Sequence, residues 1–189
     1  MNDREGRSKI FLLTGPPRIG KTTAFLKTID LMKNLGYDVG GMVTSELVRG
    51  NDRIGFSIRD INTGRIGELA SVANLDGPRL GKYGVNLVDL LAIGVGAIDR
   101  AIEYCDLIGI DEIGPMELLS PEFRSIVRKA IRVEKPILAT IHFRARNSLI
   151  EEVRSRPDSK TIEITIKNRH ELPLIICKEI SALLGHAAP

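Results

Sequence analysis

The sequence has little of what marks several large classes of protein. It contains no tryptophan and only two cysteines, Cys105 and Cys177, among 189 residues. The two cysteines lack C-x-x-C or metal-ligand spacing, which argues against a zinc ribbon or a redox dithiol. Both stand in apolar segments, so we expect buried, reduced thiols and a cytoplasmic location.

Long apolar runs are also missing. The longest uncharged apolar stretch, residues 90–98, is less than half as long as a helix that crosses a membrane. Residues 1–9 are polar and charged and lack the apolar core of a secretion signal. We therefore expect no membrane segment and no export, and we expect residues 1–8 to form a flexible tail.

Neither sign of charge dominates. The 27 Lys and Arg residues are scattered among 24 Asp and Glu residues, which leaves a net charge of +3. Proteins that bind nucleic acid more often carry a concentrated basic stripe. Nucleic acid is therefore a possible partner, but the charge distribution does not indicate it. The length and the lack of internal repeats predict a single domain over residues 1–189. No feature predicts an oligomeric state.

The most specific pattern in the chain is Gly-Pro-Pro-Arg-Ile-Gly-Lys-Thr at residues 15–22. This phosphate loop follows an apolar run and precedes helical periodicity, as in nucleotide-binding proteins. Its amides would surround phosphate oxygens, Lys21 would reach the β- and γ-phosphates, and the Thr22 hydroxyl would hold Mg²⁺. A glycine-rich turn without a ligand is the alternative. The predicted nucleotide contacts here are Gly15, Pro16, Pro17, Arg18, Ile19, Gly20, Lys21, Thr22 and Thr23.

A second motif follows an apolar strand pattern at residues 107–110, which ends in Asp111 and Glu112 in the manner of a Walker B segment. Asp111 is expected to reach Mg²⁺ through a bound water. In phosphate-loop hydrolases with two adjacent acids, the second can orient and polarise the attacking water. Glu112 is therefore the predicted catalytic carboxylate, with Lys21 stabilising charge on the phosphoryl oxygens. Two such acids can also simply mark a strand end that leaves the core.

Phosphoryl transfer benefits further from a cation near the γ-phosphate. The candidates are Arg18 in the loop and Arg144 and Arg146 after a predicted strand, although most surface arginines are only solvated. Thr140 and His142, at the end of that same strand, could sense the γ-phosphate. His142 could equally be an ordinary exposed histidine.

Hydrophobic patterning predicts strands and helices in alternation. A hairpin over residues 39–48 and 54–58 is expected to continue into a short strand at 66–70, followed by a long loop at 71–84. The alternation indicates an α/β fold with a mostly parallel sheet, helices on both faces and ligands at the carboxyl ends of strands. Further strands are predicted at 10–13, 107–110, 136–141 and 161–166, and helices at 22–35, 86–103, 120–133, 147–154 and from 168 onward.

Several separated segments resemble one known family. They are residues 15–23, 44–46, 53–56, 81–85, 111–118 and 168–169. In this order and spacing, the chain is similar to the thermophile nucleoside-triphosphatase family of P-loop proteins, whose vertebrate relative is called cancer-related nucleoside triphosphatase. The resemblance spans residues 10–170.

The resemblance implies a RecA-like sheet, in which one strand separates the acid-bearing strand from the phosphate-loop strand. It also implies Mg²⁺-dependent hydrolysis of ATP, GTP and other nucleoside triphosphates with weak base selectivity. By matching position, it implies phosphate binding by the loop, metal binding by Thr22 and Asp111, and catalysis by Glu112. Asn168 and Arg169 match a family segment near the base, although Asn168 could also be a helix cap.

Two positions depart from the family pattern, which usually has Gly in place of Arg18 and Lys in place of Pro115. We expect a negative φ at Arg18, and with it a stiffer loop apex or an added guanidinium contact to phosphate. Pro115 removes a cation just beyond the acids. Residues 44–46 and 53–56 are expected to border the site from the hairpin, or else to form hairpin core and surface charge.

Two other functions stay open at this point. A nucleotide or small-molecule kinase would need an acceptor pocket and an arginine-rich lid, for which residues 144–156 are the candidate. A nucleotide-dependent switch that binds RNA or protein would use slow hydrolysis as a timer. Asp111 and Glu112 favour hydrolysis, because a kinase positions an acceptor hydroxyl rather than a water.

Overall fold

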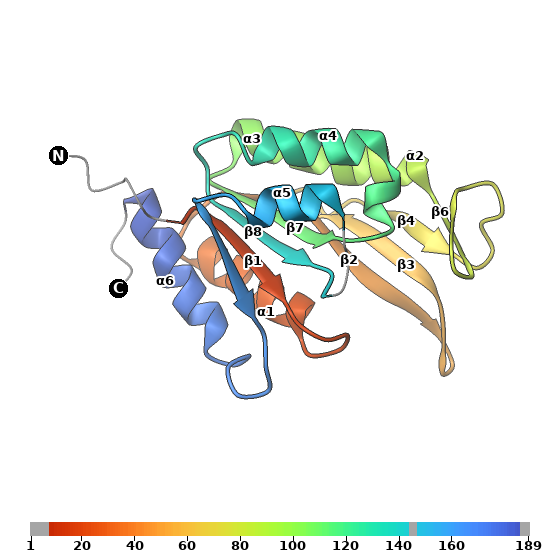
Figure 1. Ribbon diagram of the computed structural model, residues 1–189, viewed down its shortest axis with the longest axis horizontal. Helices are drawn as coiled ribbons and strands as arrows, with labels where there is room; N and C mark the ends of the chain where they lie inside the picture. Colours follow the sequence, from red (N-terminus) through yellow and green to blue (C-terminus); the bar gives the residue numbers. More distant parts are fainter. Residues whose placement is uncertain (1–7, 144–146, 186–189) are drawn as a thin grey trace.

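A computed structural model describes residues 8–143 and 147–185. Within these ranges, nine strands form one sheet in the order β5-β6-β4-β3-β2-β7-β8-β1-β9 (Figure 1). Most of the expected N-terminal tail, together with Arg144 and Arg146, lies outside the described residues. The strands are β1 (Ile10–Thr14), β2 (Val39–Arg49), β3 (Asp52–Asp60), β4 (Ile66–Ser71), β5 (Arg79–Leu80), β6 (Tyr83–Val85), β7 (Leu107–Ile113), β8 (Ile137–Ile141) and β9 (Ser159–Glu163).

Helices cover both faces of the parallel part of the sheet. On one face lie α1 (Lys21–Asn34) and α6 (Leu172–Leu184), and on the other lie α3 (Gly96–Tyr104), α4 (Pro121–Ala130) and α5 (Ser148–Arg154) (Figure 1). Strand β1 is buried along its whole length, as expected for a strand covered on both sides. Its side chains alternate, so that Ile10 and Leu12 pack under α3, α4 and α5 while Phe11 and Leu13 pack under α1 and α6.

The strand order matches the RecA-like arrangement implied by the resemblance. Strand β8 lies between β1 and β7 and pairs in parallel with both. Strands β2 and β9 extend the parallel part on either side. The α/β fold with helices on both faces of a parallel sheet is therefore confirmed.

The antiparallel part is larger than the predicted hairpin. Strand β2 continues past the parallel region and pairs with β3, which is followed by β4, β6 and β5, all antiparallel. The prediction of a long loop at residues 71–84 was wrong, because β5 and the start of β6 lie within it. Strands of two and three residues are too short to leave a periodic pattern in the sequence.

Two other predicted boundaries also differ from the structure. The helix expected from residue 168 begins at Leu172, so Asn168 is not its cap. Asn168 instead accepts a hydrogen bond from the Thr165 amide at 2.8 Å and donates to the Glu163 carbonyl at 2.9 Å, which holds the chain in a turn after β9. The helix expected over residues 86–103 is built of α2 (Leu87–Asp89), the π-helical turn η1 (Leu90–Val95) and α3.

The two cysteines are free and buried, as predicted. Burial raises the pKa of both thiols, which makes them unreactive near neutral pH. Over residues 8–143 and 147–185, no helix has the length and apolar character needed to cross a membrane.

Candidate active site

The phosphate loop joins the carboxyl end of β1 to α1. Gly15 has a φ of 148°, and a Cβ there would lie 2.9 Å from the Ile164 carbonyl oxygen, so a side chain would not fit. Lys21 is the first residue of α1, and its Nζ donates to the Gly15 carbonyl oxygen at 3.3 Å. The lysine therefore folds back over the loop, into the space where phosphates bind in loops of this kind.

Arg18 at the loop apex has a φ of 63°, which makes it the one non-glycine residue with a positive φ in the part of the chain that the structure describes. The expected negative φ was wrong. The path of the loop requires a left-handed residue at this point whatever side chain it carries. An L side chain in that conformation costs about 1–2 kcal/mol, which explains why glycine suits the position.

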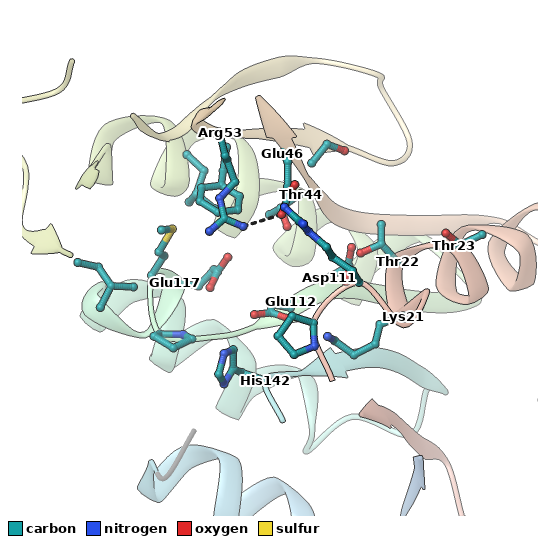
Figure 2. A pocket seen from close by; sticks show the side chains of 18 of the residues that line it. Lys21, Thr22, Thr23, Thr44, Glu46, Arg53, Asp111, Glu112, Glu117 and His142 are labelled. Carbon is teal, nitrogen blue, oxygen red and sulfur yellow. Dashed lines mark hydrogen bonds and ion pairs between the residues drawn. The ribbon is translucent and has the colours of Figure 1, made fainter. Parts of the chain in front are cut away.

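Asp111 is buried near the end of β7, and its peptide bond to Glu112 is cis. The Thr140 hydroxyl of β8 donates to its Oδ1, whereas Oδ2 is buried and has no hydrogen-bond partner among the described residues. Burial raises the pKa of Asp111 to about 6, against the opposing effects of the Thr140 and Thr22 hydroxyls. A buried, unpaired carboxylate oxygen close to the Thr22 hydroxyl is a candidate ligand for a hard cation (Figure 2).

Two further carboxyl groups lie together beyond Asp111. Burial raises the pKa of Glu112, and the nearby charge of Lys21 opposes that rise. Glu117, in the 3-10 turn η2 (Glu117–Leu119), is 3 % exposed, and burial together with the charge of Glu112 raises its pKa to about 8. A Cβ at Gly114 would lie 2.6 Å from Glu112 Oε1 and 2.9 Å from Glu117 Oε2. Gly114 therefore leaves the space in which the two carboxyl groups approach each other.

These groups line one cavity of about 600 Å³ (Figure 2). The phosphate loop and the acids form one side, which also includes Pro115 and His142. Burial and the charge of Lys21 lower the pKa of His142, so its imidazole is neutral at pH 7. The structure thus brings Lys21, Thr22, Asp111 and Glu112 to one place.

The other side of the cavity comes from the antiparallel strands, and we call it the far wall. It consists of Glu46, Arg53, Phe56, Leu69 and Leu80. Arg53 Nη1 lies 2.6 Å from Glu46 Oε1, and its Nε donates to the Tyr83 hydroxyl at 3.0 Å. The guanidinium also lies 5.0 Å from the centre of the Phe56 ring, so Arg53 is held on several sides.

Some predicted site residues lie elsewhere. Asn168 and Arg169 are absent from the cavity lining within the described residues, although the Arg169 side chain lies beside Gly20 of the loop. Arg144 and Arg146 lie outside the described residues, so the arginine-finger hypothesis stays a prediction at these positions. The rest of the predicted lid forms α5 and the turn after it, where Arg154 pairs with Glu151 and Arg156 with Asp158.

Sequence reasoning missed three features of this site. Glu117 and Gly114 entered only within residues 111–118, which resemble the family, and Tyr83 fell in the predicted loop. The far wall itself was partly predicted, because residues 44–46 and 53–56 were expected to border the site from the hairpin, and Glu46, Arg53 and Phe56 line the cavity. The burial of Glu117 depends on packing that no local pattern reports.

Comparison with known proteins gives consistent matches over nearly the whole chain. A family profile described as NTPase matches residues 10–177. The nucleoside-triphosphatase THEP1 of Thermofilum pendens is 49 % identical over 179 residues, which are 94 % of this chain and 98 % of that protein. The protein of the same name from Methanosarcina acetivorans is 43 % identical over 92 % of this chain and 97 % of its own length.

Two solved structures share the fold. The crystal structure of THEP1 from the hyperthermophile Aquifex aeolicus superposes with a TM-score of 0.78 at 31 % identity, over 88 % of this chain and 96 % of that one. The solution structure of a human cancer-related nucleoside triphosphatase gives a TM-score of 0.73 at 34 % identity, over 90 % and 95 % of the two chains.

Proposed function

Because the chain belongs to the nucleoside-triphosphatase family, we propose that it hydrolyses nucleoside 5′-triphosphates, ATP and GTP among them, to the diphosphate and inorganic phosphate. We further propose that the reaction needs Mg²⁺ and that base selectivity is weak. The observation that carries the proposal is the meeting of Lys21, Thr22, Asp111 and Glu112 around one cavity at the carboxyl edge of the sheet.

Phosphate binding is assigned to residues 15–23. The loop leads directly into the start of α1 at Lys21, where the helix dipole favours negative charge. Lys21 exchanges its bond to the Gly15 carbonyl for contacts with the β- and γ-phosphates. This cation and the amides stabilise the charge that spreads over the phosphoryl oxygens in the transition state.

The oxygens of Thr22 and Asp111 suit Mg²⁺. The buried Oδ2 of Asp111 lacks a partner among the described residues, and an unpaired buried carboxylate oxygen is costly unless a ligand completes it. The ranges that the structure describes hold no cluster of three His, Cys, Asp or Glu side chains, and Mg²⁺ beside phosphates requires none. When bound, Mg²⁺ would neutralise charge on the β- and γ-phosphates. Thr140 keeps Asp111 oriented by its hydrogen bond to Oδ1.

Glu112 is the proposed base. Its carboxyl group faces the cavity, where it orients the water that attacks the γ-phosphate and receives the water's proton. Glu117 does not share this role, because a pKa of about 8 leaves it mostly protonated at pH 7. The neutral Glu117 limits the negative charge that faces an incoming triphosphate.

Weak base selectivity is supported by where the enclosed space lies. The cavity opens toward the acids and the far wall, whereas the exposed turn that carries Asn168 and Arg169 supplies no lining residue among those described. A base near that turn would contact few enclosing side chains, and a base with few enclosing contacts is poorly discriminated. We also propose a cytoplasmic location, which the two buried free thiols support.

The test is phosphate release from ATP, GTP, CTP and UTP without any acceptor, with Mg²⁺ and with excess EDTA. We expect release from several nucleotides, loss of release in EDTA, and a fall of about 10²–10⁴-fold in Glu112→Gln with nucleotide binding retained. Glu103→Gln, which changes an exposed carboxylate, is the matched control. Unchanged turnover in Glu112→Gln would remove Glu112 from this role, and turnover that depends on added RNA or DNA would favour a switch.

A further inference from the structure

The cavity is larger than hydrolysis requires. A water molecule occupies about 30 Å³ in the liquid, and ligand pockets for small organic molecules span about 300–1,000 Å³. At about 600 Å³, this cavity is far larger than one water needs, and it extends from the phosphate loop, where the triphosphate would bind, to the far wall.

The spare room lies at the γ-phosphate end of the site. Lys21, Asp111 and Glu112 mark where the γ-phosphate would lie. From β1, the sheet passes through β8 and β7 to β2, β3 and β4, and the last three carry most of the far wall. Strand β9 lies on the opposite side of β1. The far wall therefore lies on the side of the site where the γ-phosphate and an attacking group would meet, and Figure 2 shows Glu46 and Arg53 of this wall apart from Lys21.

The far wall combines an apolar surface with a charged pair, and the binding of phosphate and water does not require this combination. Phe56, Leu69 and Leu80 give it an apolar surface beside the fixed Arg53 guanidinium. The Phe56 and Tyr83 rings meet edge to face, with an angle of 73° between their planes and ring centres 5.4 Å apart. A rigid surface that combines an aromatic ring, aliphatic groups and a charged pair is typical of a site for a flat organic molecule with polar substituents.

Charge on this side disfavours an anion. Arg53 is already paired with Glu46 at 2.6 Å, and Glu112 adds a second carboxylate near the γ-phosphate. The carboxyl groups of Glu46, Glu112 and Glu117 line the cavity together with the Arg53 guanidinium, so hydrogen-bond acceptors and donors both face it. This combination suits a neutral molecule that carries several hydroxyl groups.

We propose that the far wall binds a nucleoside and that a hydroxyl of this nucleoside accepts the γ-phosphoryl group in place of water. The hydroxyl oxygen forms a bond to the γ-phosphorus as the bond from that phosphorus to the β,γ-bridging oxygen breaks. The bonding electrons leave with the nucleoside diphosphate, and the hydroxyl proton passes to the Glu112 carboxylate. The products are a diphosphate and a nucleoside monophosphate. This transfer activity goes beyond hydrolysis and uses the same phosphate loop.

The first experiment supplies γ-labelled ATP, Mg²⁺ and one of adenosine, guanosine, cytidine or uridine, and measures labelled nucleoside monophosphate and labelled phosphate separately. We expect labelled monophosphate from at least one nucleoside. Of the 2′-, 3′- and 5′-deoxy forms of that nucleoside, the one that lacks the accepting hydroxyl should give none. Phosphate release without labelled monophosphate from any of the four nucleosides would overturn the inference and leave the proposed hydrolysis standing. Absence of both products would instead contradict the proposed function.

The second experiment fills the far wall. Leu80→Trp places a bulky ring in the cavity, and Leu75→Trp, at a leucine that is 75 % exposed and outside the cavity lining, is the matched control. We expect the ratio of monophosphate to phosphate to fall at least tenfold in Leu80→Trp and to stay within twofold in Leu75→Trp. Leu80→Phe replaces Leu80→Trp if the larger ring prevents folding. An unchanged ratio in the variant that folds would overturn the assignment of the far wall.

Discussion

The two sides of the cavity are built in different ways. The loop side depends on backbone and on buried groups, namely the tight turn at Gly15, the lysine folded over it and the buried carboxylate of Asp111. The far wall depends on side chains, and the Glu46 and Arg53 side chains in it are 40 % and 39 % exposed. Because the backbone sets the shape of the loop side, a substitution cannot change that shape without changing the fold. The loop side suits the triphosphate that all the proposed substrates share, while the far wall suits the acceptor nucleoside that we propose to bind there.

The largest expected effect comes from breaking the loop side. Lys21→Ala removes the one side chain that folds over the loop, and we expect turnover to fall about 10²-fold or more and nucleotide affinity to fall with it. Lys27→Ala, on the exposed face of α1, is the control and should change neither. Nucleotide titration and phosphate release test this. Retained affinity in Lys21→Ala would show that the amides alone hold the phosphates.

A smaller loss of turnover is expected from a substitution at Gly114, where the two sides of the cavity meet. In Gly114→Ala, the new Cβ would lie 2.6 Å from Glu112 Oε1, so the Glu112 carboxyl group must move. Displacing a catalytic group by a fraction of an ångström lowers turnover by about tenfold to a hundredfold, while the phosphate loop is untouched. We therefore expect lower turnover with unchanged nucleotide affinity. Unchanged turnover would show that Glu112 tolerates displacement and would weaken its assignment as the base.

The next prediction concerns pH. The folded pKa of Glu117 is about 8, above the ordinary value of 4.5, so the folded protein binds a proton that the unfolded chain releases between these values. Its contribution to stability is full below about pH 4.5 and is lost as pH rises toward 8. The slope is at most about 1.4 kcal/mol per pH unit.

Denaturant titration from pH 5 to pH 8 in EDTA measures this slope. Asp111, with a pKa of about 6, acts in the same direction over the lower part of the range. Glu117→Gln cannot ionise and should flatten the profile mainly above pH 6. Equal slopes in the two proteins would contradict a protonated Glu117 in the folded state.

Arg18 tests whether the loop side carries strain. Arg18→Gly removes the cost of a left-handed L residue, about 1–2 kcal/mol, and adds the entropy of glycine in the unfolded chain, about 0.5–1 kcal/mol. We expect a net stabilisation of about 0.5–1 kcal/mol in the free energy of unfolding. Lys27→Gly, at an exposed helical position, should instead destabilise by about 1 kcal/mol. Destabilisation by Arg18→Gly would mean that the guanidinium makes contacts that outweigh the strain.

The comparison also explains how far the sequence could predict this protein. The phosphate loop, β1 and α1 are contiguous, so one stretch of sequence carries the glycines, the lysine and the helical period that define them. The β7 acids lie in a strand whose first residues, 107–110, form an apolar run that shows its burial. In such regions, local patterns report the structure because the interactions themselves are local.

The far wall depends on pairings between distant segments. Tyr83 meets Arg53 across 30 residues, and the strand that carries Tyr83 is three residues long. The positive φ of Arg18 could not be predicted from the sequence either, because arginine rarely adopts the left-handed conformation that the loop imposes at this position. The pKa of Glu117 results from burial by residues that no motif connects to it. Prediction failed where tertiary contacts, rather than local preference, decide the outcome.

The smallest effect is expected from the charged pair of the far wall. Both partners are partly exposed, so their ion pair contributes about 0–1 kcal/mol to stability. Glu46→Gln should therefore lower the free energy of unfolding by less than about 1 kcal/mol. Asp60 provides the contrast, since it is 1 % exposed and bonds to Arg100 at 2.6 Å and to the Thr63 hydroxyl at 2.6 Å.

Asp60→Asn should therefore cost about 2 kcal/mol or more, because it weakens a buried network. Denaturant titration of both variants decides the point. A cost in Glu46→Gln as large as that in Asp60→Asn would show that the far wall supports the fold. The small cost that we expect leaves the wall's side chains available for binding, because stability then places little constraint on them.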